Sequence, residues 1–403
     1  MFVDRVECTK CGEVYEADKA LTVCRECGGA LIFQYDLAKA SEKISKNVLE
    51  RRKETFWKFT ELLPISSPKN VVSLGEPYTP ILQISLNKRN YPKNVFAKDD
   101  GRLPTGTFKA RGIAVTVSKL KELDINHVVI PSAGNAAAAL AAYGAAAGMS
   151  VHVFMPKDAP KSNLKECLSM GARVFLVEGL INDAAAVSKK LSVKYGWFDV
   201  STNKQPYRFE GYKAAAFEIA EQFKWDPPDA VIFPTGGGEG VIGLWKGFKD
   251  LMELGWTGKI PRLIIVQSTG CAPLVKAYNN GDIEVREPWE NAETLAAGLR
   301  VPFPYASYLT LRAIRETKGS AVAVSDAEII SSMEAFFKKG IYACPEAAST
   351  LSALYKLIEG GEIDQSEKVL LYLTGNAMKY FDLLKMDKSK ITQISKETDS
   401  LLL

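Results

Sequence analysis

The 403-residue sequence lacks several features that would each point to a particular class of protein. It has almost no excess of charge, because 51 Lys and Arg residues stand against 47 Asp and Glu residues and leave a net charge of +4. So close a balance gives no reason to expect a surface that binds nucleic acid or an anionic membrane. The longest run of small apolar residues, from Ala136 to Met149, is interrupted by Gly144 and is too short to span a bilayer.

The sequence also shows no internal repeat and no low-complexity linker, and we expect no secretory signal. It begins MFVDRVECTK, with an acid and a base where a secretory signal would have a basic stretch followed by an apolar one, so we expect a cytoplasmic protein. What is present is the mixture typical of a folded globular chain, with 47% hydrophobic and 24% charged residues. At roughly 150 residues per domain, the length predicts two or three domains.

Four of the seven cysteines lie close together near the N-terminus, and the other three are far apart. Cys8, Cys11, Cys24 and Cys27 form two Cys-x2-Cys pairs, each of which can place two thiolates on one turn. Four such ligands complete a tetrahedral zinc site and leave no open position for catalysis, so we expect a structural zinc ribbon over residues 1–34. The alternative, two disulfides, would need an oxidising compartment, which nothing in the sequence indicates.

Beyond the ribbon, short apolar runs alternate with stretches of helical length. Residues 37–63, rich in Lys and Glu, are expected to be helical. The runs that we interpret as strands are 127–131, 151–156, 173–177, 230–234, 263–267, 321–324 and 369–373. Near-continuous apolar strands separated by helices predict parallel sheets covered by helices on both faces, and therefore an α/β fold.

Three junctions between an expected strand and the next helix carry residues suited to binding an anion, since ligands of α/β folds bind where strands end and helix N-termini present free N–H groups. The first, Ser132-Ala133-Gly134-Asn135, offers donors for a carboxylate. The second follows Thr235 and can form a backbone nest for a phosphate; its residues are Gly236, Gly237, Gly238, Glu239 and Gly240. The third begins at Thr374. Each alone is more often only a turn, but three at equivalent junctions favour a binding site.

Lys109, in the stretch LPTGTFKARG, stands at the first turn of an expected helix. The positive end of the helix dipole disfavours its ammonium form there and favours the free amine. A free amine in a partly dry pocket can form a Schiff base with an aldehyde cofactor. Lys109 alone would be read as an ordinary surface lysine, but beside a phosphate-binding and a carboxylate-binding loop it is the expected catalytic residue.

With these residues the chain resembles the fold-type II enzymes that use pyridoxal phosphate (PLP), whose fold is like that of the tryptophan synthase β chain, and among them the threonine synthases. The resemblance covers nearly the whole chain, from the four-cysteine ribbon through SLGEPYTP, KDDGRLPTGTFKARG, SAGN, QPYRFEGYK, PTGGGEGVIGLWKGF and LTGNAMK. It implies that Lys109 forms the Schiff base, while Asn135 bonds the pyridine 3-oxygen. It further implies that Gly236 to Gly240 hold the cofactor phosphate and that Thr374 faces the pyridine nitrogen. A neutral hydroxyl at that nitrogen suits elimination and replacement better than transamination.

The same resemblance implies a reaction that converts O-phosphohomoserine and water into threonine and phosphate. The residues Ser132, Ala133, Gly134 and Asn135 would take the substrate carboxylate. Arg208 matches the arginine that holds the substrate phosphate in threonine synthases, a task for which its planar fork is suited. The alternative for Arg208 is an ion pair with a nearby acid such as Glu210.

Several residues depart from the family's usual pattern. They are Ala110 in place of Asp, Ala136 in place of Thr, Gln205 in place of Asn, Tyr212 in place of Gln, Ala214 in place of Thr, and Glu239 in place of a small or amide residue. A Glu239 that pointed inward would repel phosphate, so we expect it to point away. The loop at Asn291 to Val301 could also reach the cofactor, with Gly298 permitting a close approach.

These departures keep two alternative functions open. Ala110 and the altered substrate loops favour a PLP-dependent dehydratase of threonine or serine, or another β- or γ-replacement enzyme. A non-enzymatic zinc-ribbon protein with an α/β scaffold is disfavoured by the presence together of Lys109, Asn135 and the glycine-rich loop. Among the enzymes, the ribbon and Arg208 favour threonine synthase.

The motifs also predict how the chain is divided. We expect a zinc ribbon over 1–34, a large PLP-binding lobe made of 35–112 and 206–403, and a small mobile lobe over 113–205. PLP would lie in the cleft between the lobes, and closure of the small lobe would exclude water from the reaction. The resemblance implies a homodimer that acts on a small, phosphorylated amino acid.

Overall fold

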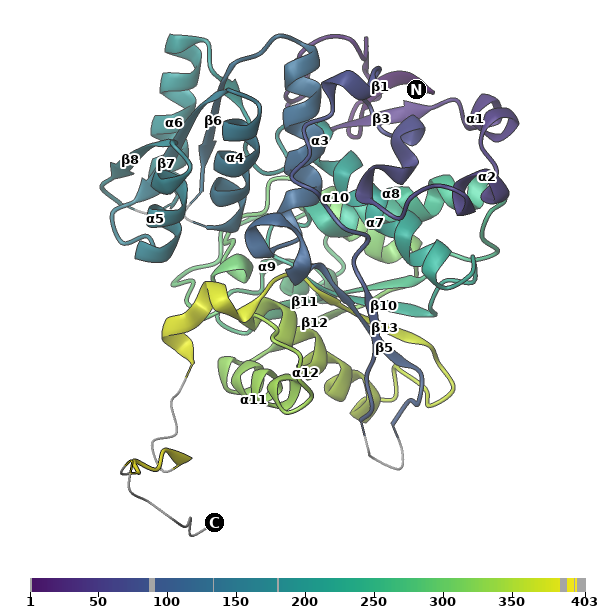
Figure 1. The fold of residues 1–403 in the computed structure, drawn as a ribbon, viewed down its shortest axis with the longest axis vertical. Helices are drawn as coiled ribbons and strands as arrows, with labels where there is room; N and C mark the ends of the chain where they lie inside the picture. Colours follow the sequence, from purple (N-terminus) through teal and green to yellow (C-terminus); the bar gives the residue numbers. More distant parts are fainter. Residues whose placement is uncertain are drawn as a thin grey trace.

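The computed structural model describes residues 2–86, 91–132, 134–179, 181–384, 390–394 and 396. It contains a small antiparallel sheet at the N-terminus and two larger sheets with helices packed on them (Figure 1). Among the described residues, no helix has the length and apolar character needed to span a membrane.

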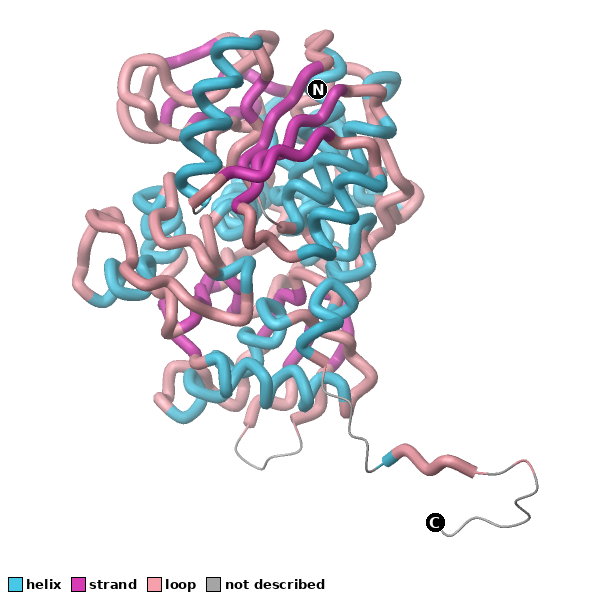
Figure 2. Tube along the Cα trace, turned by 90° about the vertical axis from the view of Figure 1, so that its left-hand side faces the viewer, coloured by secondary structure: helices cyan, strands magenta, loops and turns pink. Residues whose placement is uncertain are grey.

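The N-terminal sheet is held to the rest of the molecule by tyrosine side chains. Its strands β1 (Val3–Cys8), β2 (Val14–Tyr15) and β3 (Leu31–Tyr35) are antiparallel in the order β2-β1-β3, and Figure 2 shows them lying across the helices behind them. The hydroxyl of Tyr207 accepts a 2.9 Å hydrogen bond from the backbone N–H of Leu21. The hydroxyl of Tyr308 accepts another of 2.9 Å from Ala30. These bonds fix the sheet to helices α7 (Tyr207–Gln222) and α10 (Ser307–Glu316).

The larger sheet has six strands in the order β12-β11-β10-β13-β5-β4, all parallel except β4. Its strands are β4 (Ile81–Gln83), β5 (Val95–Asp99), β10 (Ala230–Pro234), β11 (Arg262–Ser268), β12 (Ala321–Val324) and β13 (Val369–Leu373). Alternate residues of β10 enter two separate cores: Val231 packs with α7, α8 and α10, whereas Ile232 packs with α11 and α12. The further helices are α8 (Glu239–Glu253), α9 (Pro273–Asn279), α11 (Asp326–Phe337) and α12 (Pro345–Glu359). Helices therefore cover both faces, as predicted.

The second parallel sheet has four strands in the order β8-β7-β6-β9. They are β6 (His127–Pro131), β7 (Ser150–Pro156), β8 (Arg173–Val177) and β9 (Phe198–Asp199). Val128 on one face shares a core with α3 (Lys109–Glu122) and α4 (Asn135–Ala146), and Val129 on the other face packs near Ala184 of α6 (Ile181–Tyr195). Helix α5 (Lys161–Ser169) lies between β7 and β8 in the chain.

The expectation of one helical stretch over 37–63 is wrong in detail. The chain forms three short helices there, α1 (Leu37–Lys43), α2 (Lys46–Glu50) and the 3-10 helix η1 (Phe56–Leu62). The backbone is extended at Ile44, and the side chain of Ser45 then accepts from the N–H of Val48 to begin the next helix. The other 3-10 turns are η2 (Pro68–Asn70), η3 (Asp100–Arg102), η4 (Pro104–Gly106), η5 (Ala297–Leu299) and η6 (Ala377–Leu383).

All the strands expected from apolar runs are present, as β6, β7, β8, β10, β11, β12 and β13. The strands that were not expected individually are β1 to β5 and β9. Strand β5 lies inside the six-stranded sheet, yet it carries the charged residues Lys98 and Asp99, which interrupt its apolar pattern.

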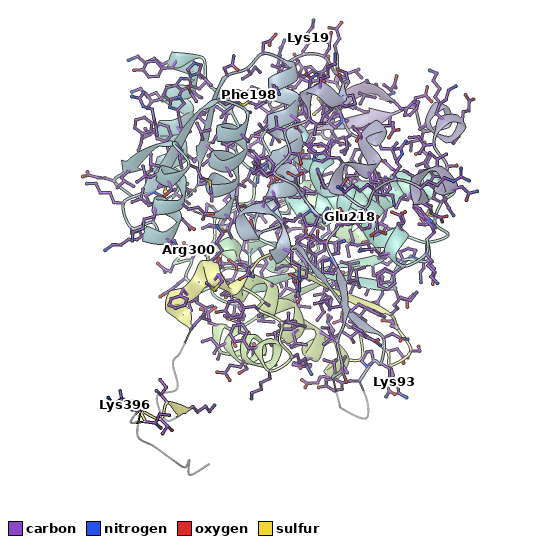
Figure 3. The ribbon with its side chains drawn as sticks, viewed as in Figure 1. Lys19, Lys93, Phe198, Glu218, Arg300 and Lys396 are labelled. Atoms are coloured by element: carbon purple, nitrogen blue, oxygen red, sulfur yellow. The ribbon has the colours of Figure 1, made fainter. Side chains whose placement is uncertain are left out.

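A cluster of charged side chains with no exposed surface joins β5, η3, α3 and α7. Arg111 donates from Nε to Asp100 at 2.7 Å and from Nη1 to Glu218 at 2.6 Å. Lys98 donates to the other oxygen of Glu218 at 2.7 Å. Figure 3 labels Glu218 in the interior of the molecule. Burial raises the pKa of Asp100 and Glu218, but the charge of Arg111 outweighs it and holds both below their ordinary range.

Glu218→Gln tests whether this cluster stabilises the fold. The substitution leaves Arg111 and Lys98 buried with one carboxylate fewer, and we expect it to lower the free energy of unfolding by about 3–5 kcal/mol. Glu253→Gln, at an exposed position of α8, removes the same charge and is expected to change it by less than about 0.5 kcal/mol. Denaturant unfolding followed by circular dichroism measures both. Equal effects of the two substitutions would show that the cluster is not a stabilising feature.

Candidate active site

The candidate site begins where the chain leaves β5 and enters α3. Two residues in the left-handed region, Thr105 with φ of 62° and Gly106 with φ of 68°, turn the chain between η4 and the helix. Helix α3 then starts at Lys109, so that this side chain belongs to the first turn, as predicted. Its Nζ lies 4.6 Å from the centre of the Phe108 ring and 5.8 Å from that of Tyr212.

The environment of Lys109 favours its free amine. Burial lowers the pKa of its ammonium group to about 8, and the positive charge of Arg208 acts in the same direction. The carboxylate of Glu239, 3.7 Å from Nζ, opposes the shift but does not cancel it. The side chain keeps 22% of its surface exposed, so the amine is shielded and still accessible. Lys109 therefore has the properties expected of a nucleophilic amine.

Arg208, at the start of α7, is paired with Glu239 and has no exposed side-chain surface. Its Nη2 lies 2.6 Å from Oε2 of Glu239, and the other oxygen of this carboxylate accepts from the backbone N–H of Asn203 at 2.8 Å. The expected alternative partner, Glu210, pairs instead with Lys213 at 2.7 Å. We expected Glu239 to point away from the site, but its side chain is buried between Arg208 and Lys109, where the guanidinium compensates its charge.

The glycine-rich loop joins β10 to α8, and it passes so close to its neighbours that side chains would not fit. A Cβ atom at Gly236 would lie 2.3 Å from the carbonyl oxygen of Gly298, and one at Gly238, whose φ is 88°, would lie 2.0 Å from Oγ1 of Thr310. The loop ends at the N-terminus of α8, where the first N–H groups have no partner within the helix. This arrangement is compatible with the backbone nest for an anion that the glycine pattern predicts, and the binding of an anion there stays a prediction.

Thr374, at the end of β13, lies against the segment that carries Lys109. The backbone N–H of Phe108 donates to the carbonyl oxygen of Thr374 at 2.9 Å, and Thr107 forms an isolated β-bridge with Gly375. Thr374 itself is 5% exposed. The ends of β5 and β13, which are neighbours in the sheet, therefore bring the third predicted junction to the first turn of α3.

The Ser132–Asn135 loop lies at the carboxyl end of β6, in the four-stranded sheet. Asn135 begins α4, and Oγ of Ser132 accepts from the N–H of Gly134 at 3.3 Å. Helix α4 packs against η4, the turn before Lys109. Ala133 lies outside the described residues. In the part of the chain that the structure describes, no hydrogen bond joins Ser132, Gly134 or Asn135 to Lys109, Arg208 or Glu239.

Sequence reasoning missed Glu346, a buried carboxylate at the start of α12. Its Oε1 accepts from the N–H of Gly298 at 2.7 Å and from the hydroxyl of Tyr380. Its Oε2 has no hydrogen-bond partner among the described residues. The contact between Gly298 and Gly236 places this group behind the glycine-rich loop. That the loop at Asn291 to Val301 reaches the cofactor stays a prediction. The sequence signal was Pro345 at the first position of a helix, followed by an acid.

The residues present fit PLP. The donor set combines an amine of lowered pKa, a glycine-lined nest at a helix N-terminus for a phosphate and a hydroxyl at Thr374. Two further buried hydroxyls, Oγ1 of Thr105 and of Thr107, lack a partner among the described residues and flank the turn before Lys109. Buried polar atoms are normally bonded, so unpaired ones here indicate a polar ligand.

The four cysteines near the N-terminus fit a metal ion. Their Sγ atoms all lie within 4.8 Å of one another, and three of the separations are 3.4 Å (Cys8 to Cys27), 3.4 Å (Cys11 to Cys27) and 3.6 Å (Cys11 to Cys24). Tetrahedral coordination at a metal–sulfur distance of about 2.3 Å places sulfur atoms about 3.8 Å apart. The predicted ligand set is therefore assembled.

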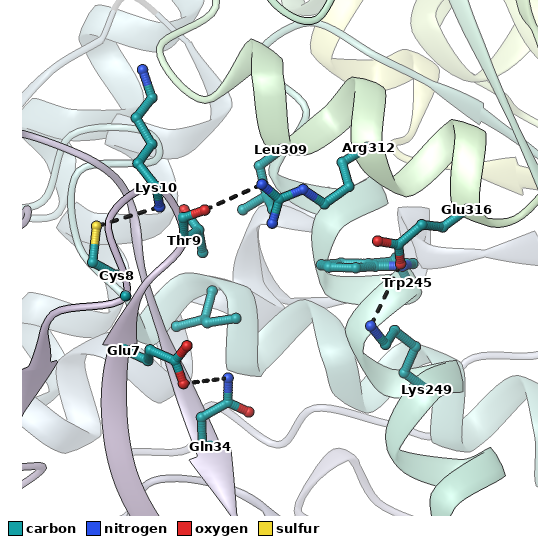
Figure 4. Close-up of a pocket in the computed structure, with 12 residues that line it drawn as sticks. Glu7, Cys8, Thr9, Lys10, Gln34, Trp245, Lys249, Leu309, Arg312 and Glu316 are labelled. Atoms are coloured by element: carbon teal, nitrogen blue, oxygen red, sulfur yellow. Dashed lines mark hydrogen bonds and ion pairs between the residues drawn. The ribbon is translucent and has the colours of Figure 1, made fainter.

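A separate cavity of about 300 Å³ lies between the ribbon and helices α8 and α10 (Figure 4); of the predicted site residues, only the metal ligand Cys8 lines it. Its polar groups bond one another. Arg312 donates to the carbonyl of Thr9 at 3.3 Å, and Glu316 accepts from Trp245 at 3.0 Å and from Lys249 at 3.5 Å. The cavity marks the contact between ribbon and body rather than the chemistry at Lys109.

Comparison with known proteins identifies relatives across nearly the whole chain. The family model described as "Pyridoxal-phosphate dependent enzyme" matches residues 72–375. A threonine synthase of Methanocaldococcus jannaschii is 35% identical over 375 residues, which are 92% of this chain and 92% of that protein. One of Methanosarcina acetivorans is 34% identical over 377 residues, 93% of this chain and 92% of that protein.

Solved structures share the fold at low sequence identity. The processed form of threonine deaminase isoform 2 from Solanum lycopersicum superimposes with a TM-score of 0.64 at 22% identity, covering 86% of this chain and 92% of that chain. Maize serine racemase gives 0.63 at 21% identity, covering 74% and 88%. The expected fold class, a fold-type II α/β enzyme preceded by a small four-cysteine sheet, is confirmed, and the alternative of a non-enzymatic binding protein is excluded. The chain belongs to the family of pyridoxal-phosphate dependent enzymes, and within it to the threonine synthase family.

Proposed function

We propose that this protein is a threonine synthase, which converts O-phosphohomoserine and water into threonine and phosphate. The single observation that carries the proposal is the group formed by Lys109, Glu239 and Arg208, which puts an amine of lowered pKa next to a guanidinium suited to a phosphate. The relatives that match over 92% and 93% of this chain support the same reaction through their name, threonine synthase.

In this proposal the predicted residues keep their roles. Lys109 would bind PLP covalently, Gly236 to Gly240 would hold its phosphate, Asn135 its 3-oxygen and Thr374 its pyridine nitrogen. Bound PLP supplies an electron sink that stabilises negative charge on the carbon atoms of an amino acid. The neutral hydroxyl of Thr374 leaves this sink weaker than an acidic partner would, which suits elimination and replacement.

The remaining steps belong to side chains of this protein. Ser132 to Asn135 would hold the substrate carboxylate, and Arg208 its phosphate. Lys109 would remove the proton from the α carbon, move protons at the β carbon while phosphate leaves, and assist the addition of water at the β carbon. The pKa of about 8 leaves its amine able both to accept and to return a proton near neutral pH.

The division of the chain and its assembly complete the proposal. We propose that residues 113–205 form a small lobe that closes on the substrate and excludes water, that 35–112 and 206–403 form the large lobe, and that 1–34 form a zinc ribbon. The ribbon would hold α7 and α10 in place through Tyr207 and Tyr308. A cytoplasmic homodimer is the assembly that the family resemblance implies.

One observation favours a second candidate, a dehydratase of threonine or serine. Arg208 already has a carboxylate partner in Glu239 and no exposed surface, so it does not need a substrate phosphate to balance its charge. Ala110, which is buried beside Lys109 where the family usually has Asp, also favours the dehydratase.

Assays of the purified holoenzyme separate the two functions. We expect phosphate release from O-phosphohomoserine with an equal amount of threonine, and little keto acid from threonine or serine. Phosphate is followed with a colorimetric assay, and keto acid with a coupled dehydrogenase. Keto acid formed from threonine without any phosphate release from O-phosphohomoserine would replace the synthase with the dehydratase.

The identity of the cofactor lysine can be tested with a neighbouring lysine as the control. After borohydride reduction, we expect the cofactor to remain attached to wild-type protein and to Lys379→Ala but not to Lys109→Ala. Lys379 lies beside Gly106, close to the same turn, but its ammonium group is paired with Glu166. Peptide mapping identifies the labelled residue.

Because the pKa of Lys109 is lowered to about 8, the rate at which the cofactor attaches to apoprotein should rise as the pH approaches that value and level off above it. Label on Lys379 would overturn the assignment.

The ribbon is expected to bind one zinc ion per chain. Cys24→Ser removes one of four thiolates and should abolish zinc binding and lower the Tm by on the order of 5–10 °C, because metal binding contributes to folding. Cys167→Ser alters a buried cysteine outside the cluster and should retain the zinc. Elemental analysis and thermal unfolding measure the two effects. Wild-type protein without metal, and with the same Tm as Cys24→Ser, would contradict a structural zinc.

A further inference from the structure

We propose that Glu239 determines specificity by occupying Arg208: a substrate phosphate binds only by displacing the Glu239 carboxylate from the guanidinium. The inference rests on the proposed function, because it concerns how a phosphorylated substrate is recognised at the same site. It assigns a role to a residue at which this chain departs from the family's usual pattern.

The pair has the geometry of a strong, shielded interaction. Oε2 of Glu239 lies 2.6 Å from Nη2 of Arg208, and the side chains are 1% and 0% exposed. The contact is an ion pair without hydrogen-bond alignment, because Oε2 of Glu239 has no hydrogen-bond partner among the described residues. Exclusion of water strengthens the attraction between the two charges. An anion that uses Arg208 therefore has to replace a carboxylate already bound there.

Arg208 has a donor that the carboxylate does not use. Its Nη1 donates to the carbonyl of Val200 at 3.2 Å, and its Nη2 also reaches the hydroxyl of Tyr212 at 3.4 Å. Its Nε is buried and has no partner among the described residues. A phosphate has enough acceptor oxygens to hydrogen-bond both Nε and Nη2, whereas Glu239 forms only an ion pair with Nη2. The unpaired donor gives a phosphate an advantage over the resident carboxylate.

Glu239 has another cation within reach when it leaves Arg208. Nζ of Lys109 lies 3.7 Å from the same oxygen, and the backbone N–H of Asn203 holds the other oxygen at 2.8 Å. The displaced carboxylate can thus pair with Lys109 without leaving the buried site. Whenever the amine of Lys109 is free rather than bound to the cofactor, a carboxylate closer to it favours its ammonium form, which can donate a proton.

A purely structural ion pair would predict something different. If Glu239 only stabilised the fold, its removal would lower stability and leave the affinity for phosphate unchanged or weaker. If Glu239 competes with phosphate, its removal strengthens phosphate binding even where it lowers stability. The affinity for phosphate therefore separates the two roles.

The test uses holoenzyme and inorganic phosphate as the probe, measured by titration calorimetry. We expect Glu239→Gln to bind phosphate at least about tenfold more tightly than wild type, because the substitution removes a negative charge that competes for Arg208. The double variant Glu239→Gln/Arg208→Gln should lose this gain. Glu61→Gln breaks a different Glu–Arg pair, that of Glu61 with Arg52 at 2.5 Å, and should match wild type. Glu239→Gln that binds phosphate no more tightly than wild type would overturn the proposal.

A second variant covers the case in which Glu239→Gln does not fold with its arginine unpaired. Glu239→Asp keeps the charge but shortens the side chain by one methylene, so it weakens the ion pair with Arg208 without removing it. It should therefore strengthen phosphate binding by about two- to threefold, less than the effect expected of Glu239→Gln. Unchanged affinity in this variant would also overturn the proposal. With O-phosphohomoserine, the substitution should lower KM more than it changes kcat.

The outcomes distinguish this inference from the proposed function. If wild-type enzyme releases no phosphate from O-phosphohomoserine, the proposed function fails, yet tighter binding of inorganic phosphate by Glu239→Gln would still establish competition at Arg208. If wild-type enzyme does release phosphate but the variants bind it no better, the proposed function stands and the role of Glu239 fails.

Discussion

The position of Lys109 depends on a buried ion pair two residues further along its helix. Arg111 has no exposed surface and is held by Asp100, which follows β5, and by Glu218, which lies on α7. These bonds fix the first turn of α3 between the sheet and α7, so Lys109 cannot shift without breaking them. A buried charge is tolerated only with such partners, and the site is rigid for the same reason. The amine can then be shielded enough for its pKa to fall without being closed off from a ligand.

Close backbone packing brings the other two charged residues of the site to Lys109. A Cβ atom at Gly211 would lie 2.1 Å from the carbonyl oxygen of Arg111, and one at Gly243 would lie 2.9 Å from that of Phe209. Glycine at these places lets α7 approach both α3 and α8 more closely than side chains would allow. Arg208 at the start of α7 and Glu239 at the start of α8 are consequently within bonding distance.

The sequence predicts those parts of the fold that rest on local patterns, and it fails where charge is compensated by tertiary contacts. Apolar runs identify seven strands, and cysteine spacing identifies the four thiols that the structure assembles. Strand β5 was not predicted because a lysine such as Lys98 is normally exposed. Its burial depends on a hydrogen bond to Glu218, which is distant in the sequence. The inward position of Glu239 was missed for the same reason, since its partner Arg208 is fixed only by the packing of α7 on α8. Glu346 is a third case, because its partners Gly298 and Tyr380 come from distant segments.

Three of the six residues that depart from the family's pattern, Gln205, Tyr212 and Glu239, lie at Arg208 or at the start of its helix. Gln205 accepts hydrogen bonds from the N–H groups of Tyr207 and Arg208 at 2.8 and 3.1 Å and so caps the start of α7. Tyr212 is within 3.4 Å of the guanidinium, and Glu239 is paired with it. Three departures thus contact one arginine and its helix, whereas Lys109, the glycines of the loop and Thr374 follow the family. Changes concentrated at one side chain are expected to affect which substrate is selected more than the chemistry of the cofactor, which we propose to rest on the unchanged residues.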